Sequence, residues 1–282
     1  MSGVGWPSAA SPVVAVIGDP IAHSLSPLLH NAAFAALGLD WVSVGFRVPG
    51  GEAQAALDAA RALSLRGLSV TMPHKAEVAA HVNELTPTGR RLDAVNCVIV
   101  DNGRLIGDNT DGRGFLASLE RATGLDPVGL RCLVLGAGGA ARAVVVALAD
   151  AGASDIAVWA RRAEPANAAA ELAGSVGRLG EPEETATADL IVNATPAGMA
   201  GTPAADERPP VDPASLSSDH VVVDLIYEPR RTAWLEACAG QGARTLGGLG
   251  MLVHQAAAQI EAWTGLEAPV GEMWAAAEAA TG

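Results

Sequence analysis

Short apolar runs alternate along the chain with longer segments in which apolar residues recur at helical spacing. The runs that predict strands are Val13–Gly18, Trp41–Val48, Gly67–Val70, Ala94–Val100, Arg104–Gly107, Arg131–Leu135, Asp155–Ala160, Ala188–Asn193, His220–Leu225 and Ala243–Leu246. The segments that predict helices are Pro27–Leu37, Ala53–Leu63, Ala76–Glu84, Phe115–Thr123, Ala141–Ala151 and Met251–Thr264. Such alternation is typical of α/β architecture with largely parallel sheets.

Three segments rich in glycine or proline interrupt this pattern. The pair Asn102-Gly103 lies between two short strands and predicts a hairpin turn. Residues 200–218 are rich in Pro, Ala and Asp and predict a mobile loop. Glycines 247, 248 and 250 precede the last long helix, and we interpret them as a hinge.

Length and charge narrow the class of protein. A chain of 282 residues suits two domains, and its 50% content of hydrophobic residues allows a large core. The net charge of −13 disfavours nucleic acid and anionic membrane surfaces as partners, because both would repel the protein. We find no signal peptide in Met1–Ala10 and no apolar run of the ~18 residues that a membrane span requires.

The three cysteines indicate a reducing environment. Cys97, Cys132 and Cys238 are odd in number and far apart, and they form no C-x-x-C pair. We therefore interpret them as core residues of a cytoplasmic protein. No group of His, Cys, Asp and Glu has metal-ligand spacing, and we predict no metal.

Lys75 is the only lysine in the chain, since the other 17 basic residues are arginines. An ammonium can release and regain a proton, whereas a guanidinium stays protonated in proteins. A solvated charge near a helix start at Pro73 is the alternative reading. Because a strand-like run, Leu68–Thr71, leads directly to this lysine, we favour a catalytic role.

Two further polar segments accompany Lys75. Ser24 and Ser26 are two residues apart in a segment that we expect to be extended, so both hydroxyls can point the same way. Ser26 before Pro27 also fits a helix N-cap. Residues 107–114 predict a polar loop, in which Asp111 is either a helix cap or the partner of Lys75.

A dinucleotide-binding turn follows the strand Arg131–Leu135. Gly136–Ala141 has the pattern G-x-G-x-x-A between a strand and a helix, which lets the backbone approach a pyrophosphate at the helix N-terminus. Arg161 and Arg162 end the next strand, where an NAD-type site would carry an acid. They favour a 2′-phosphate, and hence NADP, although Glu164 lies close by.

Taken together, these segments resemble the shikimate dehydrogenase family, in order and over nearly the whole chain. The matching segments are Ser24 and Ser26 before Pro27, V-T-x-P-x-K at Val70–Lys75, N-T-D at Asn109–Asp111, the glycine turn at Gly136–Ala141, N-A-T-P-x-G-M at Asn193–Met199, D-x-x-Y-x-P at Asp224–Pro229 and G-M-L-x-x-Q at Gly250–Gln255. The departures are Ser69 in place of a common Asn, Cys97 in place of a frequent Thr, and Ala160-Arg161-Arg162 in place of N-R-T.

The resemblance implies a cytoplasmic oxidoreductase that reversibly reduces 3-dehydroshikimate with NADPH, in the route to chorismate and the aromatic amino acids. It assigns proton chemistry to Lys75 and Asp111. It assigns substrate contacts to Ser24, Ser26, Thr71, Asn96, Tyr227 and Gln255. With the glycine turn and the two arginines, the cofactor contacts are Gly136, Ala137, Gly138, Gly139, Ala140, Arg161, Arg162, Asn193, Thr195, Met199 and Gly250.

The expected architecture is α/β with two domains. Residues 1–108, completed by 249–282, form a mixed or parallel α/β substrate domain to which the C-terminal helices return. Residues 109–248 form a Rossmann-type NADP-binding domain. We expect a small-molecule substrate and a possible homodimer, with no nucleic-acid or membrane partner.

Three other functions stay open. The first is a quinate/shikimate dehydrogenase that prefers NAD. The second is a methylenetetrahydrofolate dehydrogenase, which has a similar two-domain plan but lacks the paired serines. The third is a non-catalytic nucleotide-binding sensor, which would be expected to lack Lys75 or Asp111; both are present.

Overall fold

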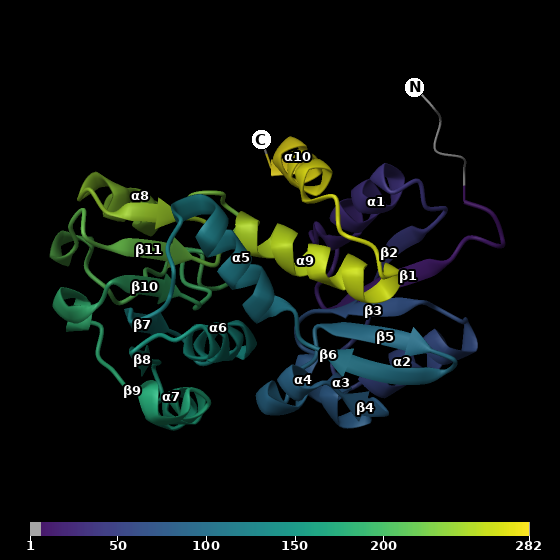
Figure 1. Ribbon diagram of the computed structural model, residues 1–282, viewed down its shortest axis with the longest axis horizontal. Coiled ribbons are helices and arrows are strands. Elements are labelled where there is room, and N and C mark those ends of the chain that lie inside the picture. The colour runs from purple at the N-terminus through teal and green to yellow at the C-terminus, as the bar shows by residue number, and fades with distance from the viewer. Residues whose placement is uncertain (1–6, 282) are drawn as a thin grey trace. The chain divides into compact units, whose positions relative to one another are not determined.

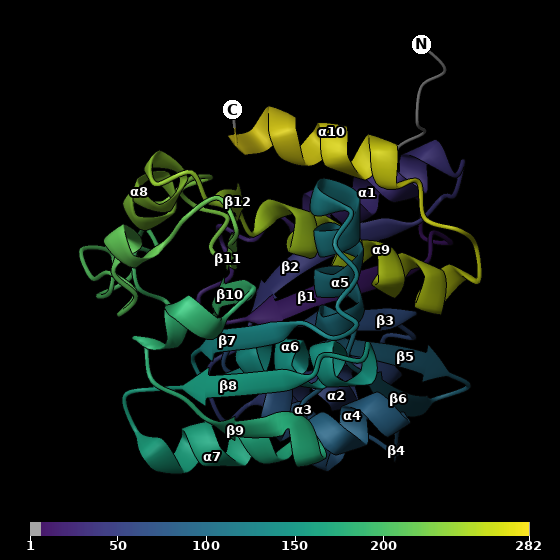
Figure 2. The same ribbon diagram turned by 60° about the vertical axis from the view of Figure 1, so that its left-hand side comes forward.

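A computed structural model describes residues 7–281 (Figures 1 and 2). These residues divide into two compact units. One unit runs to Thr110 and resumes at Val253, and the other is Asp111–Leu252. The division expected from the sequence differs from this one in the assignment of residues 109–110 and 249–252.

The first unit is built on a mixed six-stranded sheet. Its strands are β1 (Val13–Gly18), β2 (Val42–Arg47), β3 (Gly67–Val70), β4 (Glu84–Leu85), β5 (Cys97–Asp101) and β6 (Arg104–Asp108). Its helices are α1 (Ser26–Ala36), α2 (Ala53–Ala62), α3 (Lys75–His81), α4 (Pro87–Leu92), α10 (Val270–Thr281) and the part of α9 (Leu249–Thr264) from Val253 onward. The strand order is β2-β1-β3-β5-β6-β4. β1 is parallel to both of its neighbours, whereas β5 is antiparallel to β3 and β6.

A turn, a core cluster and a contact between helices account for the structure of this unit. Asn102 and Gly103 both have positive φ, 48° and 79°, which confirms the predicted hairpin turn between β5 and β6. Leu57 of α2 and Val78 of α3 are fully buried in the core cluster that contains Leu68 of β3. α10 lies beside α1 (Figures 1 and 2), so a C-terminal helix returns to the unit that the N-terminal strands form, as expected.

The second unit is a doubly wound parallel sheet. Its strands are β7 (Arg131–Leu135), β8 (Asp155–Trp159), β9 (Gly177–Leu179), β10 (Leu190–Asn193), β11 (Val221–Asp224) and β12 (Arg244–Leu246). Its helices are α5 (Asp111–Thr123), α6 (Gly139–Asp150), α7 (Ala163–Glu171) and α8 (Ala233–Gly240), with short 3₁₀ turns at Gly174–Val176, Glu184–Thr187 and Pro213–Ser215. The strand order is β12-β11-β10-β7-β8-β9, and every neighbouring pair is parallel. The order reverses between β7 and β10, as in dinucleotide-binding folds.

Helices cover both faces of this second sheet, which explains its uninterrupted apolar strands. Along β7, Cys132 and Val134 belong to the core cluster formed with α5, α6 and α7. The alternate residues, Leu133 and Leu135, belong to the cluster on the other face, which includes Trp234 of α8. The predicted α/β class is confirmed in both units.

Some predicted boundaries are wrong. The third helix ends at His81 rather than at Glu84, which pairs with β6 as part of β4. α4 was not predicted, although Thr86 caps it by accepting a hydrogen bond from the Gly89 N–H at 3.1 Å. The predicted loop at 107–114 is instead the end of β6 and the start of α5, which begins at Asp111.

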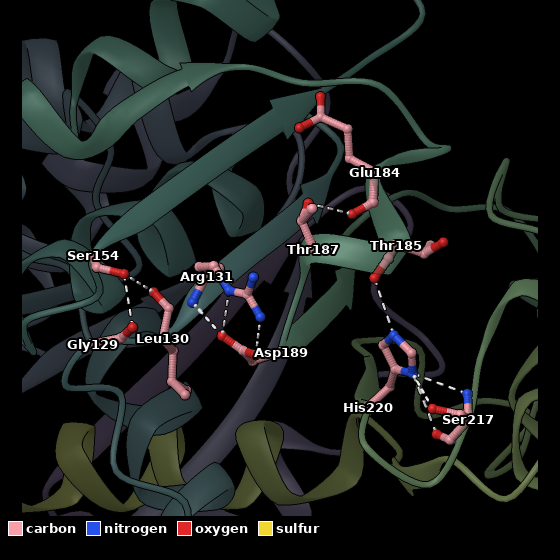
Figure 3. A network of polar contacts seen from close by, with 10 residues as sticks. All are labelled: Gly129, Leu130, Arg131, Ser154, Glu184, Thr185, Thr187, Asp189, Ser217 and His220. Atoms are coloured by element: carbon pink, nitrogen blue, oxygen red, sulfur yellow. Dashed lines mark hydrogen bonds and ion pairs between the residues drawn. The ribbon is translucent and has the colours of Figure 1, made fainter.

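Polar contacts join the ends of the second sheet at which its strands begin (Figure 3). Arg131 donates to the Asp189 carboxylate at 2.7 Å, which ties the start of β7 to the start of β10. The His220 imidazole contacts the Thr185 carbonyl at 3.0 Å through Nε2, and its Nδ1 accepts from the Ser217 N–H at 2.9 Å. These contacts lie at the end of the sheet where the strands begin, whereas the glycine turn lies at the end where they finish. We therefore assign them a role in stability.

Candidate active site

The candidate residues of the first unit gather where its parallel strands end. The chain passes from β1 to β2 on one side and later to β3 on the other, so the strand order reverses beside β1. Ligands of open α/β sheets bind at such a point, beyond the carboxyl ends of the strands. Ser24 and Ser26 follow β1, and Thr71 follows β3. Gly18 ends β1 so close to Thr71 that a Cβ on this glycine would lie 2.4 Å from the threonine methyl carbon.

The local geometry of the two serines differs from the prediction. Ser24 ends a turn, in which its N–H donates to the Ile21 carbonyl at 2.9 Å, and the segment is not extended. Ser26 is the first residue of α1 and is buried, while the N-cap position is held by Leu25. The prediction of Ser26 as N-cap is therefore wrong. It is the Ser24 hydroxyl that accepts a backbone hydrogen bond, from the Ser26 N–H at 3.3 Å.

Lys75 is the first residue of α3, and backbone contacts fix its position. Its carbonyl accepts a hydrogen bond from the Val95 N–H at 2.8 Å, which ties the helix start to the segment before β5. The preceding residue, His74, is fully buried and contacts the Val48 carbonyl at 2.7 Å through Nε2. Lys75 therefore follows β3 after a short turn, Thr71–His74, and the hydrogen bonds at His74 and Lys75 fix the position of this turn.

Asn96 lies at the same end of the sheet because β5 is antiparallel to β3. Its backbone carbonyl accepts from the Val70 N–H at 2.8 Å. Its side-chain Oδ1 accepts from the Thr110 N–H at 2.7 Å, and its Nδ2 donates to the Thr110 hydroxyl at 3.0 Å and to Gln255 Oε1 at 3.3 Å. Direct hydrogen bonds therefore join Asn96, which precedes β5, to Thr110, which lies between β6 and α5, and to Gln255 of α9.

Sequence reasoning missed two buried polar residues next to this group. Gln259, one helical turn after Gln255, donates to the Asn96 carbonyl at 3.0 Å and to Gln255 Oε1 at 3.2 Å. His30 of α1 contacts Gln259 Oε1 at 3.2 Å and the Ser43 hydroxyl at 3.0 Å. Both His30 and Gln259 are fully buried. Their polar character within apolar helix faces is the signal in the sequence, but their partners lie too far along the chain for a local pattern to identify.

His30 should make the stability of the protein depend on pH. Burial lowers the pKa of His30 to about 4, against a partly compensating hydrogen bond that the ring donates to Gln259. Between pH 6.5 and 4 the unfolded chain therefore binds a proton that the folded protein does not. We expect this residue to reduce the free energy of unfolding by about 3 kcal/mol as the pH falls through that range.

Denaturant unfolding at pH 7 and pH 4.5 measures this effect. His30→Gln should be less stable than the wild type at pH 7 but should lose less stability on acidification. The exposed His81, replaced in the same way, serves as the control and should keep the wild-type pH dependence. An identical loss in the wild type and in His30→Gln would contradict the assignment.

In the second unit, the glycine turn lies at the reversal of strand order. Gly136 follows β7 with φ 117°, and a Cβ at this position would lie 2.8 Å from the Ala194 carbonyl oxygen that follows β10. Only glycine fits such a conformation and such a close approach. Gly138 precedes α6 and has open space around its Cα, and Ala137, Gly139 and Ala140 are partly exposed beside it. The backbone N–H groups at the start of α6 are thus available to a phosphate.

The segment after β10 is held by its own hydrogen bonds. Asn193 is fully buried, and its Oδ1 accepts from the Thr195 N–H at 3.1 Å and hydroxyl at 2.6 Å. Its Nδ2 donates to Asp224 Oδ1 at 2.9 Å, and Asp224 also accepts from the Thr232 hydroxyl at 2.6 Å. Burial raises the pKa of Asp224, partly offset by these hydrogen bonds. Asn193 therefore shapes the loop beside the glycine turn, with Thr195 and Met199 partly exposed on it.

Arg161 and Arg162 lie just beyond β8, next to the glycine turn along the sheet. Both are exposed, and the Arg161 guanidinium is 4.0 Å from the Glu207 carboxylate. Arg162 is the N-cap residue of α7, without a side-chain capping bond. The position is that expected for contacts to the 2′-phosphate of NADP, and the role of the two arginines stays a prediction.

The remaining candidates also belong to the second unit. Asp111 is its first residue and is buried at the start of α5. Tyr227 is half-buried after β11, and burial raises its pKa, as does the neighbouring Glu228. Gly250 is buried in the first turn of α9. Because Lys75 belongs to the first unit, its pairing with Asp111 stays a prediction.

The described residues also bear on metal binding and on membrane insertion. Within residues 7–281, no three His, Cys, Asp or Glu side chains are grouped so that they could hold a metal ion. The same residues include no helix with the length and apolar character needed to cross a bilayer. Cys97, Cys132 and Cys238 are free and buried, as predicted.

Comparison with known proteins identifies the family. The model of the shikimate dehydrogenase substrate binding domain matches residues 16–98, and that of the shikimate 5′-dehydrogenase C-terminal domain matches residues 248–278. A shikimate dehydrogenase (NADP⁺) from Moorella thermoacetica is 43% identical over 278 residues, covering 94% of this chain and 92% of its own.

Solved structures agree with this comparison. A crystal structure of shikimate dehydrogenase in complex with NADP⁺ has a TM-score of 0.91 and 36% identity, and the match covers 97% of both chains. A quinate dehydrogenase from Corynebacterium glutamicum in complex with NAD has a TM-score of 0.87 and 31% identity, covering 95% of this chain and 99% of its own. The similarity in fold, sequence and order of motifs extends over nearly the whole chain, which belongs to the shikimate dehydrogenase family.

Proposed function

We propose that the protein catalyses the reversible NADP-dependent reduction of 3-dehydroshikimate to shikimate. One observation carries this proposal beyond family membership. Each unit has a sheet whose strand order reverses, and the predicted residues follow the strands at that point: Ser24, Ser26 and Thr71 in the first unit, and the glycine turn in the second. A hydroxyl-rich site and a dinucleotide site are what an oxidation of a polyhydroxylated ring requires.

Lys75 and Asp111 would perform the proton chemistry. NADPH, when bound, supplies hydride to the ketone carbon, and negative charge then develops on the ketone oxygen. The Lys75 ammonium would stabilise that charge and donate a proton to the oxygen, and Asp111 would orient the ammonium. A positioned donor of this kind commonly lowers the barrier by ~3–4 kcal/mol.

The cofactor would be held by the second unit. The backbone after β7 fits a pyrophosphate, because Gly136 has positive φ and no Cβ could be accommodated between it and Ala194. Arg161 and Arg162 would contact the 2′-phosphate, and Thr195, Met199 and Gly250 would border the remaining cofactor. For Asn193 we propose an indirect role, since its buried carboxamide is bonded to Thr195 and Asp224.

The decisive experiment is a matrix of shikimate and quinate against NADP and NAD, followed at the nicotinamide absorbance. The proposal predicts the highest kcat/KM for shikimate with NADP. The similarity to a quinate dehydrogenase that binds NAD makes quinate with NAD the main alternative. Absence of turnover in all four reactions would favour a non-catalytic nucleotide-binding sensor.

Replacing Ser24 by alanine should weaken shikimate binding more than it weakens the fold. The lost backbone hydrogen bond to Ser26 is 3.3 Å long and partly exposed, so we expect a loss of about 0.5–1 kcal/mol in stability. We expect the Ser24 hydroxyl to contact the substrate carboxylate, so its removal should raise KM for shikimate about tenfold. Steady-state kinetics and thermal unfolding test this, and an unchanged KM would exclude Ser24 from the site.

Location and assembly are further parts of the proposal. Three free, buried cysteines support a cytoplasmic enzyme. A homodimer is supported by β2, which forms an edge of the first sheet and carries the half-exposed Phe46. Light scattering coupled to size-exclusion chromatography measures the oligomeric state directly.

A further inference from the structure

A chain of buried hydrogen bonds leads from α1 to the candidate substrate site. Its members, in order, are Ser43, His30, Gln259, Gln255, Asn96 and Thr110. All six belong to the first unit, and each is less than one-tenth exposed. Because buried polar groups must be satisfied, the donors and acceptors along this chain constrain one another.

The orientation of the Gln259 carboxamide is determined by its neighbours. Its Nε2 lies 3.0 Å from the Asn96 backbone carbonyl and 3.2 Å from Gln255 Oε1. The carbonyl can only accept, so Nε2 must be the donor there; the opposite orientation would place two oxygens together. Gln259 Oε1 therefore faces His30 as an acceptor.

This orientation in turn determines the proton of His30. Nε2 of His30, 3.2 Å from Gln259 Oε1, must carry the hydrogen and donate. In the neutral ring Nδ1 is then an acceptor, and the Ser43 hydroxyl at 3.0 Å donates to it. Toward the candidate substrate site, Gln255 Oε1 accepts hydrogen bonds from both Gln259 and Asn96.

From this geometry we infer that Gln259, held by His30, is a positioning residue that makes Gln255 a hydrogen-bond donor toward the substrate. Both contacts on the Gln255 oxygen come from the protein, so any contact that the carboxamide makes to a ligand is made through its Nε2 hydrogens. The ligand group at this position must be an acceptor, such as a ring hydroxyl oxygen, a ketone oxygen or a carboxylate. This inference rests on the proposed function for the identity of the ligand.

A double-mutant cycle separates positioning from stability. The variants are Gln259→Met, Gln255→Met and the double substitution, each assayed for shikimate binding by calorimetry and for kcat/KM. We expect Gln259→Met to weaken shikimate binding about tenfold, the factor that corresponds to one hydrogen bond. In the Gln255→Met background the same change should have almost no further effect on binding, because it acts through the missing carboxamide.

Trp234→Phe is the matched control. Trp234 is buried in the second unit, and its Nε1 donates to the Val211 carbonyl at 2.9 Å, so the variant also loses one buried side-chain hydrogen bond to a backbone oxygen. It should lower Tm but leave shikimate affinity unchanged. If Gln259→Met fails to fold, Gln259→Glu takes its place, since it keeps the acceptor for His30 and removes the donors to Gln255.

Nitrogen-15 NMR shows which ring nitrogen of His30 carries the proton, and this distinguishes positioning by Gln259 from a purely structural role. The wild type should show His30 protonated at Nε2, and this preference should be lost in Gln259→Met but kept in Gln259→Glu. The inference would be overturned if Gln259→Met weakened shikimate binding equally in the wild type and in Gln255→Met, or if the wild-type His30 carried its proton at Nδ1. Binding of shikimate without turnover would overturn the proposed reaction alone, and absence of binding by the wild type would overturn both.

Discussion

Replacing Lys75 by arginine is expected to lower kcat by about 10²–10⁴, as much as replacing it by alanine. Both arginine and lysine supply a positive charge at the start of α3, but only an ammonium can pass a proton to the substrate oxygen and recover it. NADP binding and Tm should change little, because the glycine turn belongs to the other unit and the backbone bond from Val95 to residue 75 is kept.

Several measurements make this expectation specific. Glu77→Gln, in the same helical turn, changes the charge by one, as Lys75→Ala does, and should retain nearly normal kcat. Since Lys75 is the only lysine, an amine-directed reagent modifies this side chain and the N-terminus alone, and shikimate should protect the side chain. Near-normal turnover in Lys75→Arg would refute the acid–base role and leave Asp111 as a helix residue.

Removing the charges of Arg161 and Arg162 should shift the cofactor preference of the enzyme from NADP toward NAD. Each charge-assisted contact to a phosphate is worth ~1.5–3 kcal/mol, so the double glutamine variant should raise KM for NADP by about 10²-fold or more. KM for NAD should hardly change, because NAD lacks the 2′-phosphate. Both side chains are exposed, so the stability cost should be small.

The neighbouring Glu207 provides a control of opposite sign. Its carboxylate is 4.0 Å from the Arg161 guanidinium, and Glu207→Gln should leave NADP binding unchanged or slightly tighter. Single substitutions at 161 and 162 then show which arginine carries the preference. Parallel changes in KM for both cofactors would show that the arginines form only a solvated surface.

The sequence predicted those features that local chemistry determines. β3 was predicted with its observed bounds, because Gly67–Val70 is a short apolar run next to a polar turn. Asn102-Gly103 required positive φ at both residues, and both have it. The glycine turn after β7 was also recognisable, since Gly136 can be replaced by no other residue at φ 117°.

Other features depend on contacts that a local pattern does not contain. Ser26 before Pro27 has the composition of a cap, yet the preceding turn brings Ser24 to the backbone N–H instead. Glu84 fits a helical pattern but joins β4 because β6, twenty residues later, offers it a parallel partner. His30 and Gln259 are separated by 229 positions, and only the folded first unit shows that they meet.

The discontinuity of the first unit imposes an order on its synthesis. Residues 111–252 form a continuous unit that can fold as soon as it leaves the ribosome, because domains generally fold in the order in which they emerge. Folding of the first unit cannot be completed until translation has nearly ended, because His30 lacks Gln259 and α1 lacks α10 before then. Until then the face of α1 that contacts α10 stays uncovered, and a chain that ends at residue 252 would contain the whole second unit but not the residues that complete the first.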